Sequence, residues 1–469
     1  MPVEPAAPPV ESAAEGPSPL RTSVWETMLW GLLVLFVAVA ALQPFLASET
    51  SRGTTEEPAL STEWILEMRY ALGLERLRGQ WSDDALDAGI GPLAAAPATS
   101  TAERFARMIA LDAVDPAAAR AELESLRDEA ADGMPLAEDL AAFESVFAAP
   151  PRPVDNVTEQ RLLERYGWFG ELALSRLEGD ASPRRVEMLA STDRMARLLT
   201  AVGSALAALL VLGCGLLTVA VVRWRRGELQ SAYRVSTIGA SPRRVPFLET
   251  LLLFLYGLQI VAALALLIFG ERLGTAAQLV VLAILPALLW PVVRGHDLRE
   301  TLRGLGWQRG RGLVREAGAG VVVYVATLPA LALGLGMTLW LSSTFDLAPS
   351  HPIVDWLRDP SLTDLVVVTL LAAVWAPIAE ETVFRGAFFH YLRGRFGAWS
   401  SAAVSAFVFA AIHPQGVAAW PVLGALAIGL AAAREWRGSS IAAIVMHALH
   451  NGLALLLLLS LSAGTVGGL

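Results

Sequence analysis

Long apolar runs separated by short polar segments make up most of the chain. The first run, at residues 24–47, is long enough to cross a bilayer and carries Trp25 and Trp30 at one edge. Because it exceeds the ~7–15 residues of a signal-peptide core and lacks a small-residue cleavage site, we interpret residues 23–47 as an uncleaved membrane anchor. The runs together predict about nine membrane-spanning helices, at residues 24–47, 196–222, 246–270, 276–293, 316–342, 363–392, 398–413, 416–433 and 439–461.

Residues 48–194 have a different pattern, in which apolar residues recur at helical spacing among charged ones. Breaks that contain proline and glycine near residues 91–97 and 150–153 divide this segment into four to six predicted helices. We therefore expect a soluble, acidic α-helical domain inserted after the first span. Residues 1–22 are rich in Pro, Ala, Ser and Glu and are expected to form a disordered tail.

The composition supports a membrane protein, since 54% of the 469 residues are hydrophobic, only 17% are charged and the mean hydropathy is +0.50. The single cysteine, Cys214, excludes an intrachain disulfide, a zinc finger and an iron–sulfur cluster. We expect an all-α fold, a polytopic helical bundle in a lipid bilayer, with no nucleic-acid partner. The oligomeric state stays open.

Charge is distributed unevenly along the chain. Residues 48–194 hold 28 acidic residues and 15 arginines, whereas residues 195–469 hold 13 and 20. Two loops, at residues 223–244 and 294–315, are rich in arginine and should be cytoplasmic by the positive-inside rule. Counting helices from these loops predicts a multi-pass protein of the inner (plasma) membrane with a cytoplasmic N-terminus and an extracytoplasmic acidic domain. The same count places four later arginines on the cytoplasmic side: Arg393, Arg395, Arg434 and Arg437.

Ionisable side chains are costly inside a bilayer, so those within apolar runs are candidates for function. Glu381 and Arg385 are four residues apart, with the carboxylate on the N-terminal side, which favours an ion pair on one helix face. Glu380 points about 100° away from that pair and is the better candidate for a general base. Pro377 lacks a backbone donor, so it predicts a kink that admits water.

Three further polar residues lie on two other predicted helices. His447 and Asn451 are four residues apart, so one helix would present an imidazole and an amide that can both donate to a developing oxyanion. His413 follows Phe409 by the same spacing. Helix counting puts His413 near the outer end of its span and Glu380 nearer the inner end. A tilt, a break at Pro377 or a re-entrant segment would reconcile the two depths.

The remaining histidines are expected to have structural or solvated positions. His390 and His450 lie in apolar runs without a spaced polar partner and are expected to pack in the bundle. His296 and His351 lie in predicted loops and are expected to be solvated.

Three motifs carry the strongest signal: Glu380-Glu381-x-x-x-Arg385, Phe409-x-x-x-His413 and His447-x-x-x-Asn451. In this order they resemble the motifs of the CAAX-prenyl-protease and bacteriocin-processing (CPBP, or Abi) family of intramembrane proteases. The resemblance covers residues 362–461 and implies a catalytic transmembrane domain there. The apolar runs and arginine-rich loops predict that transmembrane helices with basic cytoplasmic loops precede it at residues 195–361. Nothing in it covers the acidic domain.

The resemblance implies hydrolysis of a peptide bond in a membrane-associated protein or peptide. The excess of Ala and Arg and the layout of an anchor followed by a domain favour a bacterial source. It implies that Glu380 activates water, that His413 helps to position the water, and that His447 and Asn451 stabilise the oxyanion. The residues implied to hold the geometry of the site are Glu381, Arg385 and Phe409.

The resemblance leaves two mechanisms open. We prefer one without a cofactor, since the H-E-x-x-H arrangement and cysteine ligands are absent. A zinc site would use Glu380, His413 and His447.

Two other functions compete with the protease. In one, the chain is a catalytically inactive scaffold or receptor whose extracytoplasmic domain binds a partner, while the polar helix residues lock the bundle. In the other it is a secondary transporter, which is disfavoured because no second half with interrupted helices is visible.

Overall fold

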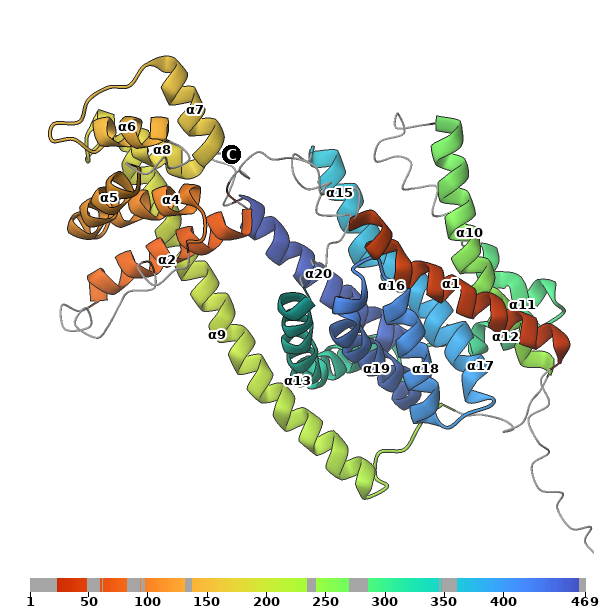
Figure 1. Cartoon of the computed structure of the whole chain (residues 1–469). Coiled ribbons are helices and arrows are strands. Elements are labelled where there is room, and N and C mark those ends of the chain that lie inside the picture. The colour runs from red at the N-terminus through yellow and green to blue at the C-terminus, as the bar shows by residue number, and fades with distance from the viewer. Residues whose placement is uncertain are drawn as a thin grey trace, which may run out of the picture. The chain divides into compact units, whose positions relative to one another are not determined.

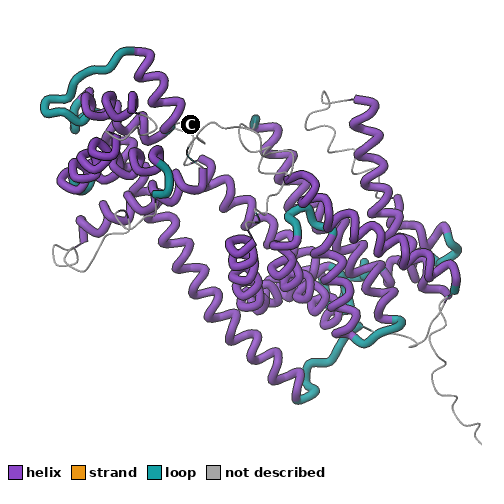
Figure 2. The backbone as a smooth tube through the Cα atoms, viewed as in Figure 1, coloured by secondary structure: helices purple, strands orange, loops and turns teal. Residues whose placement is uncertain are grey.

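The chain folds into helices and connecting loops, with no strand in the part that the structure describes (Figure 2). It forms two compact units, one of Met1–Arg52 with Leu209–Leu455 and the other of Gly53–Ala208 with Leu456–Leu469. The computed structural model describes residues 23–48, 60, 62–81, 93, 98–130, 137–233, 242–269, 286–345, 347 and 361–463. The predicted tail at residues 1–22 and the loop that contains His351 lie outside these residues.

The predicted polytopic helical bundle is confirmed (Figure 1). Within the described residues, seven helical segments are long and apolar enough to cross a membrane. They are α1 (Val24–Ser48), α9 (Pro183–Arg225), α10 (Val245–Phe269), α13 (Leu313–Phe345), the continuous segment Leu362–Arg393, α19 (Trp420–Arg437) and α20 (Ile441–Ala463).

The other two predicted crossings differ from these seven. In place of residues 398–413 the structure has α18 (Ala398–Ala411), whose 14 residues extend only ~21 Å and so fall short of a ~30 Å hydrocarbon core. Most of the predicted crossing at 276–293 lies outside the described residues. Its described end contains the four-residue helix α11 (Trp290–Val293).

The segment Leu362–Arg393 positions the candidate glutamates and is not broken at Pro377. Instead, its hydrogen-bond register changes twice, at two π-helical stretches in which each N–H bonds to the fifth preceding carbonyl. Pro377 follows the first stretch, where the altered ladder accommodates a residue that has no N–H to donate. In order, the segment consists of α15 (Leu362–Leu370), η6 (Leu371–Trp375), α16 (Ala376–Glu381), η7 (Thr382–Phe388) and α17 (Phe389–Arg393).

The helices around this segment approach one another closely because small residues lie at the crossings. A Cβ atom on Gly320 of α13 would lie 2.5 Å from the carbonyl oxygen of Ala442 in α20. A Cβ atom on Gly334 would lie 2.8 Å from the carbonyl oxygen of Pro421 in α19. Any side chain at these two positions would force the helices apart.

The anchor helix α1 packs on the membrane unit through polar contacts as well as apolar ones. The carboxylate of Glu26 is buried and bonds to the hydroxyl of Tyr391 and the guanidinium of Arg395. The indole of Trp25 donates to Glu249 of α10 at 2.8 Å. The one acidic residue of the anchor therefore ties α1 to the end of the segment that carries the candidate site.

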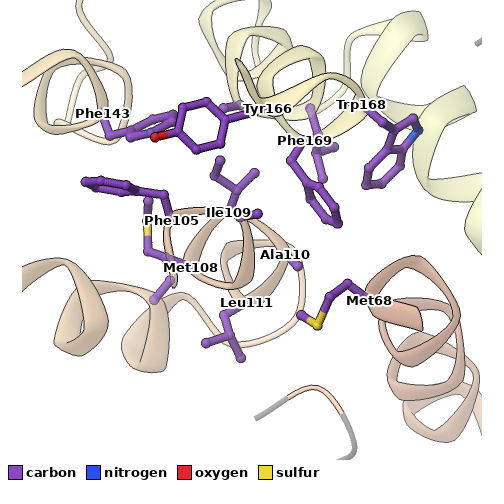
Figure 3. Close-up of a cluster of buried hydrophobic side chains, with 14 of the residues drawn as sticks. Met68, Phe105, Met108, Ile109, Ala110, Leu111, Phe143, Tyr166, Trp168 and Phe169 are labelled. Atoms are coloured by element: carbon purple, nitrogen blue, oxygen red, sulfur yellow. The ribbon is translucent and has the colours of Figure 1, made fainter. Parts of the chain in front are cut away.

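The second unit is a helical domain, as the sequence predicts. Six helices precede α9 in its described part: α2 (Thr62–Trp81), α4 (Thr101–Asp112), α5 (Pro116–Ala130), α6 (Ala137–Val146), α7 (Asn156–Tyr166) and α8 (Trp168–Leu174). Its core contains Phe105, Phe143, Tyr166 and Phe169 (Figure 3). The expected boundary at residues 194/195 falls inside α9, which runs unbroken from this unit into the other because the apolar run begins in the middle of the helix.

We expect Asp139→Ala to loosen the helical domain. Asp139 has no exposed surface, accepts a hydrogen bond from the Tyr166 hydroxyl at 2.9 Å and pairs with Arg165 at 2.6 Å. Removing the carboxylate takes a buried hydrogen-bond acceptor and counter-charge away from these groups, at a cost of about 3 kcal/mol. Hydrogen exchange on the full chain should show protection of α6 and α7 amides lowered about 100-fold.

The neighbouring Glu138→Ala is the control. Its side chain is 83% exposed and pairs with Arg161 at the surface, so the change should cost less than about 0.5 kcal/mol. Equal loss of protection in the two variants would contradict the role given to Asp139.

Candidate active site

The two adjacent glutamates of α16 occupy different environments. The Glu381 side chain is fully buried, whereas that of Glu380 is 24% exposed. Consecutive residues of a helix point about 100° apart, so one faces the packed interior while the other reaches a partly open space. The sequence predicts this division between them.

Glu381 and Arg385 form the predicted ion pair, with Nη1 3.2 Å from Oε1 and both side chains without exposed surface. The guanidinium also donates from Nη2 to the carbonyl oxygen of Ala427 in α19 at 3.1 Å. Its central carbon lies 4.6 Å from the centre of the Phe409 ring of α18. The charge is therefore held by a carboxylate, a carbonyl dipole and an aromatic face.

His447 of α20 joins this pair, since its Nδ1 lies 2.9 Å from Oε1 of Glu381. A carboxylate paired with an arginine is an acceptor, so Nδ1 carries the hydrogen and Nε2 is the second ring nitrogen available for chemistry. Asn451, four residues further along α20, donates from Nδ2 to the carbonyl oxygen of Ala372 in η6 at 2.9 Å. The amide thus fixes α20 against the π-helical stretch before the glutamates and keeps one further N–H.

His413 faces Glu380, with His413 Nε2 4.0 Å from Glu380 Oε2. Its Nδ1 lies 2.5 Å from the carbonyl oxygen of Phe409, which can only accept, so Nδ1 carries the hydrogen and a neutral ring leaves Nε2 with its lone pair. The difference in depth expected between the two residues is absent. His413 follows the end of the short helix α18, which brings it level with Glu380.

One of the arginines that the sequence places on the cytoplasmic side is buried in the structure. Arg434 is only 1% exposed and donates from Nε to the carbonyl oxygen of Arg385 at 3.0 Å. Its place at the end of an apolar helix is compatible with either a solvated or a buried side chain. The backbone carbonyls that Arg385 and Asn451 bind were not visible in the sequence either.

The other histidines follow the predictions in part. His390 lies with Nδ1 2.5 Å from the hydroxyl of Tyr233, and the His450 ring packs 6.0 Å from that of Tyr324, as expected for packed residues. The prediction for His296 is wrong. Its side chain is 7% exposed, because its ring packs against Phe247 at 5.6 Å.

The proposed zinc ligands do not come together as a set of three. In the described part of the chain, no group of three His, Cys, Asp or Glu side chains is placed to hold a metal ion. His447 bonds to Glu381, whereas His413 faces Glu380. Within the described residues, Glu380, His413 and His447 are therefore not gathered into one group of three.

Comparison with known families identifies the segment that carries these residues. Residues 362–453 match the family described as type II CAAX prenyl endopeptidase, Rce1-like. The match includes all three motifs, confirms the resemblance to CAAX proteases for about a fifth of the chain and leaves out the acidic domain. No curated protein and no solved structure gives a significant match to the chain.

The two glutamates should differ in their effect on stability. Glu381→Gln leaves the buried guanidinium of Arg385 without its counter-charge, which typically costs about 3 kcal/mol. Glu380→Gln should change the unfolding free energy by less than about 0.5 kcal/mol, because Glu380 makes no hydrogen bond through Oε2 to the described residues.

Thermal unfolding of the full chain in detergent distinguishes the two variants. We expect a clear drop in the unfolding midpoint for Glu381→Gln and none for Glu380→Gln. A similar drop in both would mean that Glu380 also holds the bundle together.

Proposed function

Because residues 362–453 match the CAAX prenyl endopeptidase family, we propose that the chain is an intramembrane endopeptidase. Its substrate would be a membrane-associated protein or peptide, and its nucleophile a water molecule activated by Glu380. The chain would lie in the inner (plasma) membrane with its N-terminus in the cytoplasm, as the arginine distribution predicts.

The observation that carries the proposal is the pairing of Glu380 with His413. The two facing atoms, Oε2 and Nε2, are 4.0 Å apart, too far for a direct hydrogen bond. If a water oxygen lay about 2.8 Å from each atom, the angle at the water between Oε2 and Nε2 would be about 90°. Oε2 of Glu380 is buried and makes no hydrogen bond to the described residues, so it is available to accept from that water.

The tautomer of His413 supports this role. With the Nδ1 hydrogen donated to Phe409, Nε2 accepts one hydrogen of the water while Glu380 accepts the other. The lone pair of the water then faces the scissile carbonyl. As the oxygen attacks, its proton passes to Glu380, which then protonates the departing amine, so Glu380 returns to its carboxylate form.

Stabilisation of the tetrahedral oxyanion would fall to α20. Asn451 has one N–H beyond the one given to Ala372. His447 can donate from Nε2 only as an imidazolium, because Nδ1 already donates to Glu381. The carboxylate of Glu381 would balance that added charge, which assigns it a second task beside the pairing with Arg385.

We expect Glu380→Gln to lower cleavage at least about 100-fold, the usual contribution of a general base, while the protein stays folded. The full chain in lipid nanodiscs is incubated with a membrane-protein preparation, and newly formed N-termini are identified by mass spectrometry. Glu228→Gln removes an exposed carboxylate with the same change of charge and should leave cleavage unchanged.

A strong chelator added to the native chain separates the two open mechanisms. Cleavage that persists with chelator and disappears in Glu380→Gln supports a metal-free glutamate mechanism. Loss with chelator indicates a metal site. Products that appear equally with Glu380→Gln contradict the proposal, and the absence of native-dependent products favours the scaffold function.

A further inference from the structure

A second polar site lies at the helix ends of the membrane unit. A cavity of about 730 Å³ opens where the start of α10, helix α12 (Leu298–Gly304), α17 and the end of α19 meet. Its lining is mostly polar and includes Tyr233, Arg243, Arg244, His296, Glu300, Arg303, Gln308, His390 and Arg434. None of the residues implied in peptide hydrolysis lines it.

The cavity carries an excess of positive charge. Among the described residues, four guanidinium groups and one carboxylate, that of Glu300, line it. Within the described residues, Arg243, Arg244 and Arg303 form no ion pair with a carboxylate. The Glu300 side chain is 54% exposed, so solvent screens it as a counter-ion for the arginines.

The buried arginine of the cavity also has no carboxylate partner among the residues that the structure describes. Arg434 donates to three backbone carbonyls, those of Arg385, Gly304 and Gly438. The nearest acidic residue in the sequence, Glu435, pairs with Arg393 instead. Burying a cation that only dipoles compensate is costly, so an anion in the cavity would stabilise this arrangement.

The remaining lining supplies further hydrogen-bonding groups. Tyr233 and His390 bond to each other at 2.5 Å, and the guanidinium of Arg434 lies 4.8 Å from the centre of the Tyr233 ring. Nδ1 of His296 is buried and makes no hydrogen bond to the described residues. An anion with several oxygens would find donors on more than one side.

We propose that this cavity binds a phosphate-bearing anion, either the headgroup of an anionic phospholipid or a soluble phosphate ester. Guanidinium groups match phosphate oxygens in geometry and charge. The volume suits a headgroup-sized ligand rather than a bare ion. Basic pockets between membrane helices on the cytoplasmic side are typical sites for such headgroups, and the arginine distribution predicts that side here.

The proposal does not depend on the proposed proteolysis, because it concerns binding alone. The full chain in non-ionic detergent is titrated with glycerol 3-phosphate by calorimetry. In a second arm, the chain in nanodiscs of phosphatidylcholine with or without phosphatidylglycerol is examined by native mass spectrometry for retained lipid. Binding in the first arm identifies a soluble ester as a ligand, and retention in the second identifies a lipid headgroup.

Two variants and a matched control locate the site. Arg244→Gln and Arg303→Gln should each weaken binding at least tenfold in whichever arm the native chain binds. Arg299→Gln changes an exposed arginine on the same helix as Arg303 that does not line the cavity, and should leave binding within twofold of native. Arg303 is exposed, as Arg299 is, so Arg303→Gln is expected to fold even if Arg244→Gln does not.

Equal weakening by Arg299→Gln would overturn the proposal, because binding would then follow the general surface charge. Binding of neither probe by the folded native chain would overturn it as well. Partial recovery of binding in Arg303→Lys, which restores the charge without the planar fork, would support phosphate recognition by this side chain.

Discussion

The burial of one ion pair inside apolar helices governs the arrangement of the candidate active site. Neither Glu381 nor Arg385 has any exposed surface, so the desolvation of both charges has to be offset by contacts from neighbouring helices. His447 of α20 and the Ala427 carbonyl of α19 supply hydrogen bonds, and the Phe409 ring of α18 supplies its face. Satisfying the two charges therefore brings together three helices around the glutamate segment, and the reactive groups come with them.

In this arrangement one turn of helix carries two carboxylates, of which one is buried in an ion pair and the other is partly exposed. Glu381 is fixed by its partners, whereas the adjacent Glu380 faces His413 across a gap of 4.0 Å. The π-helical stretches on both sides contribute, because they release backbone groups from the regular ladder. The carbonyl of Ala372, which lies in the first stretch, accepts a hydrogen bond from Asn451, and this bond connects the segment to α20.

Helical spacing was sufficient to predict the Glu381–Arg385 pair and the separate direction of Glu380, because both follow from positions on one helix. Contacts between helices were not predictable in this way. Spacing placed His447 and Asn451 on one face of α20, yet their partners lie on different turns of the glutamate segment. The common depth of His413 and Glu380 depends on where α18 ends, which a hydrophobic run does not reveal. The family resemblance, rather than the hydrophobic pattern, predicted that His413 and Glu380 act together.

Sequence-based prediction has a similar limit for the arginines, and one of them connects the two polar sites. Counting basic residues predicts which side of the membrane a loop faces, but it does not distinguish a solvated arginine from a buried one such as Arg434. That residue lines the basic cavity and also donates to the carbonyl oxygen of Arg385. An anion bound beside Arg434 would offset the charge of its guanidinium. Arg434 in turn contacts Arg385, which is the ion-pair partner of Glu381. The candidate active site and the cavity are thus joined through hydrogen bonds, so the charge state of one affects the electrostatic field at the other.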